Sequence, residues 1–199
     1  MHAGVTVTIT DVMIRNGRAP ERPNNARSAG DGGGIGNAGT LVLLSCDIGD
    51  NRAGNGFVGN WEQLNGGDGG QGGGIFNAGT LMLESSTVHN NVAGTGGHSG
   101  EFGYAGEAGH GGGLYNTGKL VIKDSTIQDN STAISGRTIS PPGIACGSGG
   151  GIYNMGSLTL DGSTIHRNRT ANGNSCGGTH TIAGDGGYGG GIYNANTFE

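Results

Sequence analysis

The sequence predicts an all-β protein, a right-handed parallel β-helix of about five three-stranded coils with long glycine-rich loops. Three observations lead to this prediction. A Gly-Gly-Gly triplet begins at Gly32, Gly72, Gly111, Gly149 and Gly189, at spacings of 38 to 40 residues. An apolar pattern of period two follows the first four triplets, and no segment shows the 3.6-residue period of a helix. Self-similarity at a period of this size indicates a solenoid, a propeller or an array.

Each coil is expected to hold three short strands. In the fourth copy the first strand lies at 152–154, directly after the triplet, and the second and third lie at 158–160 and 163–165. Their apolar residues alternate with polar ones, a pattern that favours strand. Turns at Gly156 and Gly162 separate them. Strands this short form no sheet alone, so each is expected to pair with the same strand one coil away.

This register stacks like residues on like residues and predicts four inward apolar columns. Burying one aliphatic side chain contributes roughly 1.5–3 kcal/mol, so the columns make a thin but continuous core. The columns are Ile35, Ile75, Leu114, Ile152 and Ile192; Leu41, Leu81, Leu120 and Leu158; Leu43, Leu83, Ile122 and Leu160; and Ile48, Val88, Ile127 and Ile165.

Two asparagine columns are predicted at the corners of the coils. Stacked side-chain amides can hydrogen-bond along the solenoid axis, and asparagine is also a good turn residue. Both interpretations give these residues a structural rather than a catalytic role. The columns are Asn37, Asn77, Asn116, Asn154 and Asn194, and Asn51, Asn91, Asn130 and Asn168.

The chain is therefore expected to form one domain over residues 1–199. The 48 glycines and 4 prolines would by themselves suggest disorder, but the apolar residues recur in register. The net charge of −5 and the lack of a Lys/Arg run argue against a nucleic-acid partner. No apolar run reaches the ~20 residues that a membrane span needs. The expected repeats are 1–31, 32–71, 72–110, 111–148 and 149–188, with a partial coil at 189–199.

Two spaced motifs carry a resemblance to a known family. Gly-Gly-Gly-Ile followed by Ile-x-x-Asn resembles the repeat of the chlamydial polymorphic outer-membrane proteins and related bacterial surface proteins. This chain departs from their pattern by Gly where Ala is typical and by Ile or Val in place of Phe. The resemblance covers nearly the whole chain and implies a parallel β-helix with an extracellular or cell-surface location and an adhesive role. Neither a signal peptide nor a surface anchor is recognised in this chain.

The loops between coils are rich in glycine, and one of them has a regular pattern. Gly97, Gly100, Gly103, Gly106 and Gly109 fall at every third position, the spacing at which extended three-residue-per-turn helices pack closely. A small bundle of such helices beside the solenoid is one interpretation. Mobile loops are the favoured one, because few apolar residues offset the cost of ordering a loop.

The sequence predicts no catalytic, cofactor-binding or metal-ligating residue. Acidic residues are scattered, whereas a polysaccharide lyase or hydrolase needs converging carboxylates. Glu84, Lys123 and Asp161 share an outward column and are expected to form a structural charge ladder. The histidines lack the spacing of metal ligands. We therefore expect a non-enzymatic protein, with a polysaccharide-degrading β-helix as the alternative.

One outward column is aromatic and is the candidate binding stripe. Exposed aromatic residues at one-coil spacing are suited to binding a surface glycan or another protein. The alternative is that the loops fold over this column and cover it. The stripe consists of Phe76, Tyr115, Tyr153 and Tyr193.

A second outward column, Thr87, Thr126 and Thr164, suggests ice binding by a flat face as a weaker alternative. Met13 and Asp47 interrupt this column, and no second threonine rank accompanies it.

The three cysteines do not form a disulfide framework. Cys46 replaces a serine that recurs in the other coils and is expected to be a small buried residue. Cys146 and Cys176 lie in successive loops, so they form either a disulfide or two unpaired thiols.

Together these patterns favour a structural or adhesive β-solenoid located outside the cell or on its surface. The chain starts at the second strand of a coil and stops after the first strand of another. The two end coils are therefore complementary, which predicts head-to-tail association of copies into filaments. The alternative is that the chain is a piece of a longer array.

Overall fold

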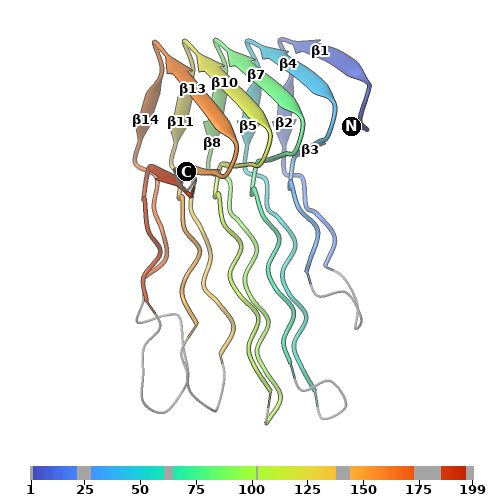
Figure 1. The fold of residues 1–199 in the computed structure, drawn as a ribbon, viewed down its shortest axis with the longest axis vertical. Coiled ribbons are helices and arrows are strands. Elements are labelled where there is room, and N and C mark those ends of the chain that lie inside the picture. The colour runs from blue at the N-terminus through green and yellow to red at the C-terminus, as the bar shows by residue number, and fades with distance from the viewer. Residues whose placement is uncertain are drawn as a thin grey trace.

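The computed structural model describes residues 2–21, 28–60, 65–101, 103–137, 144–172 and 185–195. In these residues the chain forms parallel strands and no helix, so the predicted parallel β-helix is confirmed. Three five-stranded sheets run along the solenoid (Figure 1). The first sheet holds β3 (Ile35–Asn37), β6 (Ile75–Asn77), β9 (Leu114–Asn116), β12 (Ile152–Asn154) and β15 (Ile192–Asn194).

The other two sheets are formed by the second and third strands of each coil. The second sheet holds β1 (Thr6–Thr10), β4 (Thr40–Leu44), β7 (Thr80–Glu84), β10 (Lys119–Lys123) and β13 (Ser157–Asp161). The third holds β2 (Met13–Arg15), β5 (Asp47–Gly49), β8 (Thr87–His89), β11 (Thr126–Gln128) and β14 (Thr164–His166).

The strand register places like residues side by side, as the repeat predicts. Leu120 of β10 pairs with Leu81 of β7 on one side and with Leu158 of β13 on the other. In the inner coils the inward residues of all three sheets are fully buried and form one core. In the outer coils they are only partly covered, and Leu160 is 41% exposed. Burial of the columns therefore depends on a neighbouring coil on each side.

The coils turn at single residues with left-handed backbone geometry. Asn16, Asp50 and Asn90 have φ values of 58°, 58° and 54° at the corner after the third strand. Asparagine and aspartate tolerate this conformation because their short polar side chains bond locally. Arg167 occupies the same corner with a φ of 53°. A left-handed corner at the same place in each coil keeps the strands in register.

The glycine-rich loops are ordered arms in the described residues, so the favoured expectation of mobile loops is wrong there. Each arm leaves the solenoid after the third strand and returns to the next triplet (Figure 1). The outgoing segments are 17–21, 52–60, 92–100, 131–137 and 169–172, and the returning segments are 28–34, 65–74, 104–113, 144–151 and 185–191.

Backbone hydrogen bonds join neighbouring arms at every third residue. In the outgoing segments the N–H groups of Ala53, Gly56 and Gly59 donate to the carbonyls one coil further on, at 2.8 to 3.1 Å. Extended glycine helices with three residues per turn bond to one another in this way. The less favoured interpretation, a bundle of glycine helices, is the one that the structure supports.

The arms form two layers, which we call the arm slab. Outgoing segments bond to outgoing segments and returning to returning, while Gly54, Gly70, Gly94 and Gly109 bond in a zigzag between the layers. A Cβ atom added to Gly94 would collide with the carbonyl oxygen of Gly54. Glycine at every third position is therefore what lets the two layers touch.

Candidate functional site

The predicted aromatic stripe is a ladder of stacked rings on the outer face of the first sheet. The Phe76 and Tyr115 centroids lie 5.6 Å apart, and those of Tyr115 and Tyr153 lie 5.1 Å apart, both pairs with an interplanar angle of 8°. Tyr153 and Tyr193 lie 5.1 Å apart with a tilt of 35°. Ring faces are thus turned toward one another along the axis, and the ring edges are turned outward.

Two further aromatic rings cover the ladder from the returning segments. The His110 ring stacks on Tyr153 at 4.5 Å, and the Tyr188 ring lies 6.2 Å from Tyr193. The Tyr115 hydroxyl donates to Met155 Sδ at 3.1 Å. All four residues of the stripe are half-buried. The stripe is therefore partly covered by the arms and partly accessible, and its role in binding stays a prediction.

Burial shifts the pKa values of Tyr115, Tyr153 and His110. Burial raises the pKa of Tyr115, assisted by the neighbouring Tyr153 and Asp31. Burial likewise raises the pKa of Tyr153, with Tyr193 as a second cause. The pKa of His110 is lowered because burial disfavours the imidazolium. The ladder is therefore a neutral, partly desolvated surface.

Sequence reasoning did not predict the parts played by His110 and Tyr188. Both stand directly before a glycine triplet, in a column that also contains Asp31, Gln71 and Ser148. Side chains of this column accept backbone N–H groups of the next coil, for example Gln71 Oε1 from His110 and His110 Nδ1 from Ser148 at 2.8 Å. The recurrence of a hydrogen-bonding residue directly before each triplet is the sequence pattern that could have predicted this column.

The asparagine columns form the predicted ladders. In the first column, Nδ2 of Asn37, Asn77, Asn116 and Asn154 donates to Oδ1 of the next asparagine at 2.7 to 2.8 Å. In the second, Oδ1 of Asn91 accepts both the backbone N–H and Nδ2 of Asn51 at 3.0 Å, and Asn91 Nδ2 donates to Ile48 O. The side-chain amides of both columns are therefore engaged in hydrogen bonds that hold the coils together.

The serines that recur at the Cys46 position form a hydrogen-bonded ladder beside the second sheet, a role that the sequence analysis did not predict. The hydroxyls of Ser86, Ser125 and Ser163 accept the backbone N–H of the residue one coil earlier at 3.0 to 3.1 Å. The first of these donors is Cys46, which is buried and forms no disulfide. In the described residues no buried side-chain nitrogen or oxygen lacks a hydrogen-bond partner.

Three groups of charged side chains on the solenoid are paired between coils. Lys123 Nζ lies 3.2 Å from Glu84 Oε1, which is part of the expected charge ladder. Arg167 bonds to Asp129. Asp47 lies between Arg15 and His89, with His89 Nε2 at 2.8 Å. Burial pushes the pKa of Asp47 upward, but the hydrogen bonds from Arg15 and His89 outweigh it and leave this pKa below its ordinary value.

The threonine column is assembled as expected. Thr126 pairs with Thr87 and Thr164 in the third sheet, and the column continues through Asp47 to Met13, which is 70% exposed. An exposed methionine and an ion-paired aspartate therefore lie in the same face as the threonines.

The two loop cysteines are described only in part. Cys146 is buried and disulfide-bonded. Its expected partner, Cys176, lies outside the described residues.

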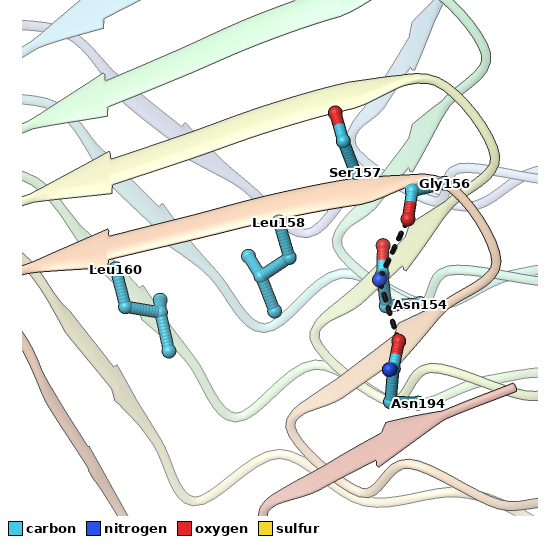
Figure 2. Close-up of a pocket in the computed structure, with 6 residues that line it drawn as sticks. All are labelled: Asn154, Gly156, Ser157, Leu158, Leu160 and Asn194. Atoms are coloured by element: carbon cyan, nitrogen blue, oxygen red, sulfur yellow. Dashed lines mark hydrogen bonds between the residues drawn. The ribbon is translucent and has the colours of Figure 1, made fainter. Parts of the chain in front are cut away.

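A hollow of about 590 Å³ opens beside the last described coil. Figure 2 shows Leu158 and Leu160 of β13 pointing into it, with Asn154 and Asn194 at its rim. Asn154 Nδ2 donates to Gly156 O and to Asn194 Oδ1 there, which completes the polar corner. The apolar part of the hollow is lined by Leu158 and Leu160, and Leu160 is 41% exposed.

Among the described residues, no three His, Cys, Asp or Glu side chains are grouped so that they could hold a metal ion. The same part of the chain contains no helix with the length and apolar character needed to cross a membrane. No protein-family model, curated protein or solved structure matches the chain.

Proposed function

We propose that the chain is a non-enzymatic structural element of the cell surface or extracellular space that associates end to end with further copies. The observation that carries this proposal is the open, apolar edge of β13 and β14 at one end of the solenoid. The resemblance of the repeat to bacterial surface proteins supports the location.

Among the described residues β13 pairs only with β10, so its other edge is an apolar surface next to backbone without a strand partner. Leu160 is 41% exposed, whereas Ile122 at the same place one coil earlier is fully buried. Leu158 and Ile165 are only partly buried. An unpaired strand edge over an open apolar core is a template for pairing with another strand.

At the opposite end of the solenoid the three sheets end at different coils, in an arrangement complementary to that at the β13 end. There β1 and β2 extend one coil beyond β3, whereas β15 extends one coil beyond β13 and β14. Setting β1 on β13, β2 on β14 and β3 on β15 continues all three sheets without a gap. Val7, Ile9 and Ile14, which are partly buried, would then cover Leu158, Leu160 and Ile165. Such a contact does not close on itself and gives a filament.

The ladders also favour a framework role over the alternatives. A sugar ring binds against the face of an aromatic ring, and the faces of Tyr115 and Tyr153 are occupied by each other. The one carboxylate–histidine ion pair among the described residues, Asp47 with His89, is held by Arg15 from a neighbouring coil. These contacts support structure rather than glycan binding or hydrolysis.

Electron microscopy and sedimentation of the 1–199 chain test the proposal. We expect filaments from the unmodified chain and monomers from Leu160→Asp, because a carboxylate in the apolar contact stays unpaired. Thr159→Asp is the matched control, since Thr159 lies on the same strand with its side chain exposed. Circular dichroism checks that each variant is folded. A monomeric unmodified chain at high concentration, or filaments from Leu160→Asp, would refute end-to-end association.

A further inference from the structure

The two layers of the arm slab have outward faces of opposite charge. Burial along the arms repeats with period three, so that two residues in each three are buried and the third is accessible, as in 92–97 and 131–136. The accessible position is the one that points away from the partner layer. Each layer therefore presents its own set of outward side chains.

The outward face of the outgoing segments is basic. It carries four arginines against one acidic residue, Glu21. Parallel bridges set Arg52 beside Arg18 and place Arg169 in the same column. None of the four arginines takes part in the ion pairs found among the described residues, whereas Arg15, Lys123 and Arg167 on the solenoid are paired. The basic face is defined by Arg18, Arg52, Arg137 and Arg169.

The outward face of the returning segments is acidic. It carries four carboxylates and, among its described residues, no lysine or arginine. Asp68 accepts the backbone N–H group of Glu107, a neutral donor that leaves the negative charge of the carboxylate in place. The acidic face is defined by Asp31, Asp68, Glu107 and Asp185.

We infer that the basic face of one molecule binds the acidic face of a second copy, side by side. Both faces are built on the same coil repeat, so their columns have a common spacing and several charge pairs can form at once. One exposed pair contributes little, and a row of them acts together. The contact uses different surfaces on the two molecules and therefore propagates into a lateral array.

This inference deepens the proposed structural role by adding a lateral contact to the axial one. It uses residues of the arms alone and does not depend on β13 or β14. The Leu160→Asp chain removes the axial contact, so lateral association is measured in that background and its failure is separate from failure of the filament.

Sedimentation velocity at low and high salt tests the inference. We expect association at about 20 mM NaCl that is lost at about 0.5 M, because the screening length falls with ionic strength. Arg52→Glu with Arg169→Glu should abolish it, and so should Glu107→Lys with Asp185→Lys. Lys119→Glu, an exposed charge reversal on the solenoid, should leave it unchanged.

Mixing the two double variants gives the sharpest result. The first keeps its acidic face and the second keeps its basic face, so a 1:1 mixture should associate although neither variant associates alone. Association that persists in high salt, double variants that associate like the parent, or a mixture that stays monomeric would each overturn the inference.

Discussion

At the scale of single residues, the buried asparagines connect one coil to the next. Asn91 is fully buried and bonds to Asn51 and Ile48 in the coil before it and to Asn130 in the coil after it. The same side chain thus satisfies backbone groups at a corner and links neighbouring amides.

Replacing Asn91 by Ala should destabilise the protein by about 3 kcal/mol or more, since each buried group left without a partner costs about 1–3 kcal/mol. Asn55→Ala is the comparison, because Asn55 is half-exposed on an arm and water can replace its bonds. Urea unfolding measures both. Similar losses of unfolding free energy at the two positions would show that the asparagine ladder contributes no more to stability than an exposed asparagine.

His110 should make stability depend on pH. Its pKa is lowered by burial from the ordinary 6.5, and its Nδ1 accepts the N–H of Ser148, which a protonated ring cannot do. The unfolded chain therefore takes up the proton first as pH falls. The contribution of His110 is complete above about pH 6.5 and is lost as pH falls from there toward its folded pKa.

The variant His110→Gln tests this assignment. Gln71 holds the same position one coil earlier and accepts the N–H of His110 through Oε1. Glutamine at 110 should thus keep an acceptor for Ser148 without a proton to gain. Thermal unfolding between pH 7.5 and 5.0 should show a smaller fall in Tm for the variant than for the parent, because one histidine fewer takes up a proton on unfolding. An unchanged slope would assign the pH dependence to other groups.

At the scale of single strands, the alternation of side chains in β10 fixes which face is core. Ile122 is fully buried between Leu83 and Leu160, while Lys123 points outward to Glu84. Ile122→Ala should cost about 2–5 kcal/mol, whereas Lys123→Ala should be nearly neutral. Chemical denaturation decides between them, and equal effects would mean that the strand faces are assigned wrongly.

At the scale of the arms, glycine is required where the layers touch. A Cβ at Gly94 would collide with backbone of Gly54 and Gly70, whereas a Cβ at Gly36 meets no atom within 4 Å. Gly94→Ala should destabilise the chain by about 1–3 kcal/mol as an overpacked contact, and Gly36→Ala should have little effect. Hydrogen exchange of the arm amides measures the protection lost in each variant. Unchanged protection in Gly94→Ala would argue against the two-layer packing.

These elements differ in how far the sequence predicts them. The sheets follow from the period-two pattern, because Leu81, Leu120 and Leu158 mark both strand and register. The arms do not, because few apolar side chains mark the register of bonds such as that from Gly56 to Thr95. The aromatic stripe was predicted from Tyr115 and Tyr153, but its stacking and its cover by His110 depend on how the arm returns. The charge segregation between the layers likewise emerges only once the arms are placed.

At the scale of the molecule, the solenoid and the arm slab are two hydrogen-bonded stacks that share one coil repeat. The sheets are held by an apolar core, and the slab is held mainly by backbone bonds between glycine-rich segments. Each arm bonds to the arms of the coils before and after it. The slab should therefore respond to changes in one arm over several coils, and the solenoid should not.

Removing one distal arm tests this division. Gly109 N–H donates to Gly94 O at 2.8 Å, so a short turn can replace residues 95–108 without moving β8 or β9. The neighbouring arms lose partners, since Gly56 and Gly69 donate to Thr95 and Glu107 and Gly136 donates to Gly106. Amide exchange should accelerate at Gly56, Gly69 and Gly136, while the amides of β7 and β10 stay protected. Loss of protection throughout the sheets would show instead that the slab is part of the folding core.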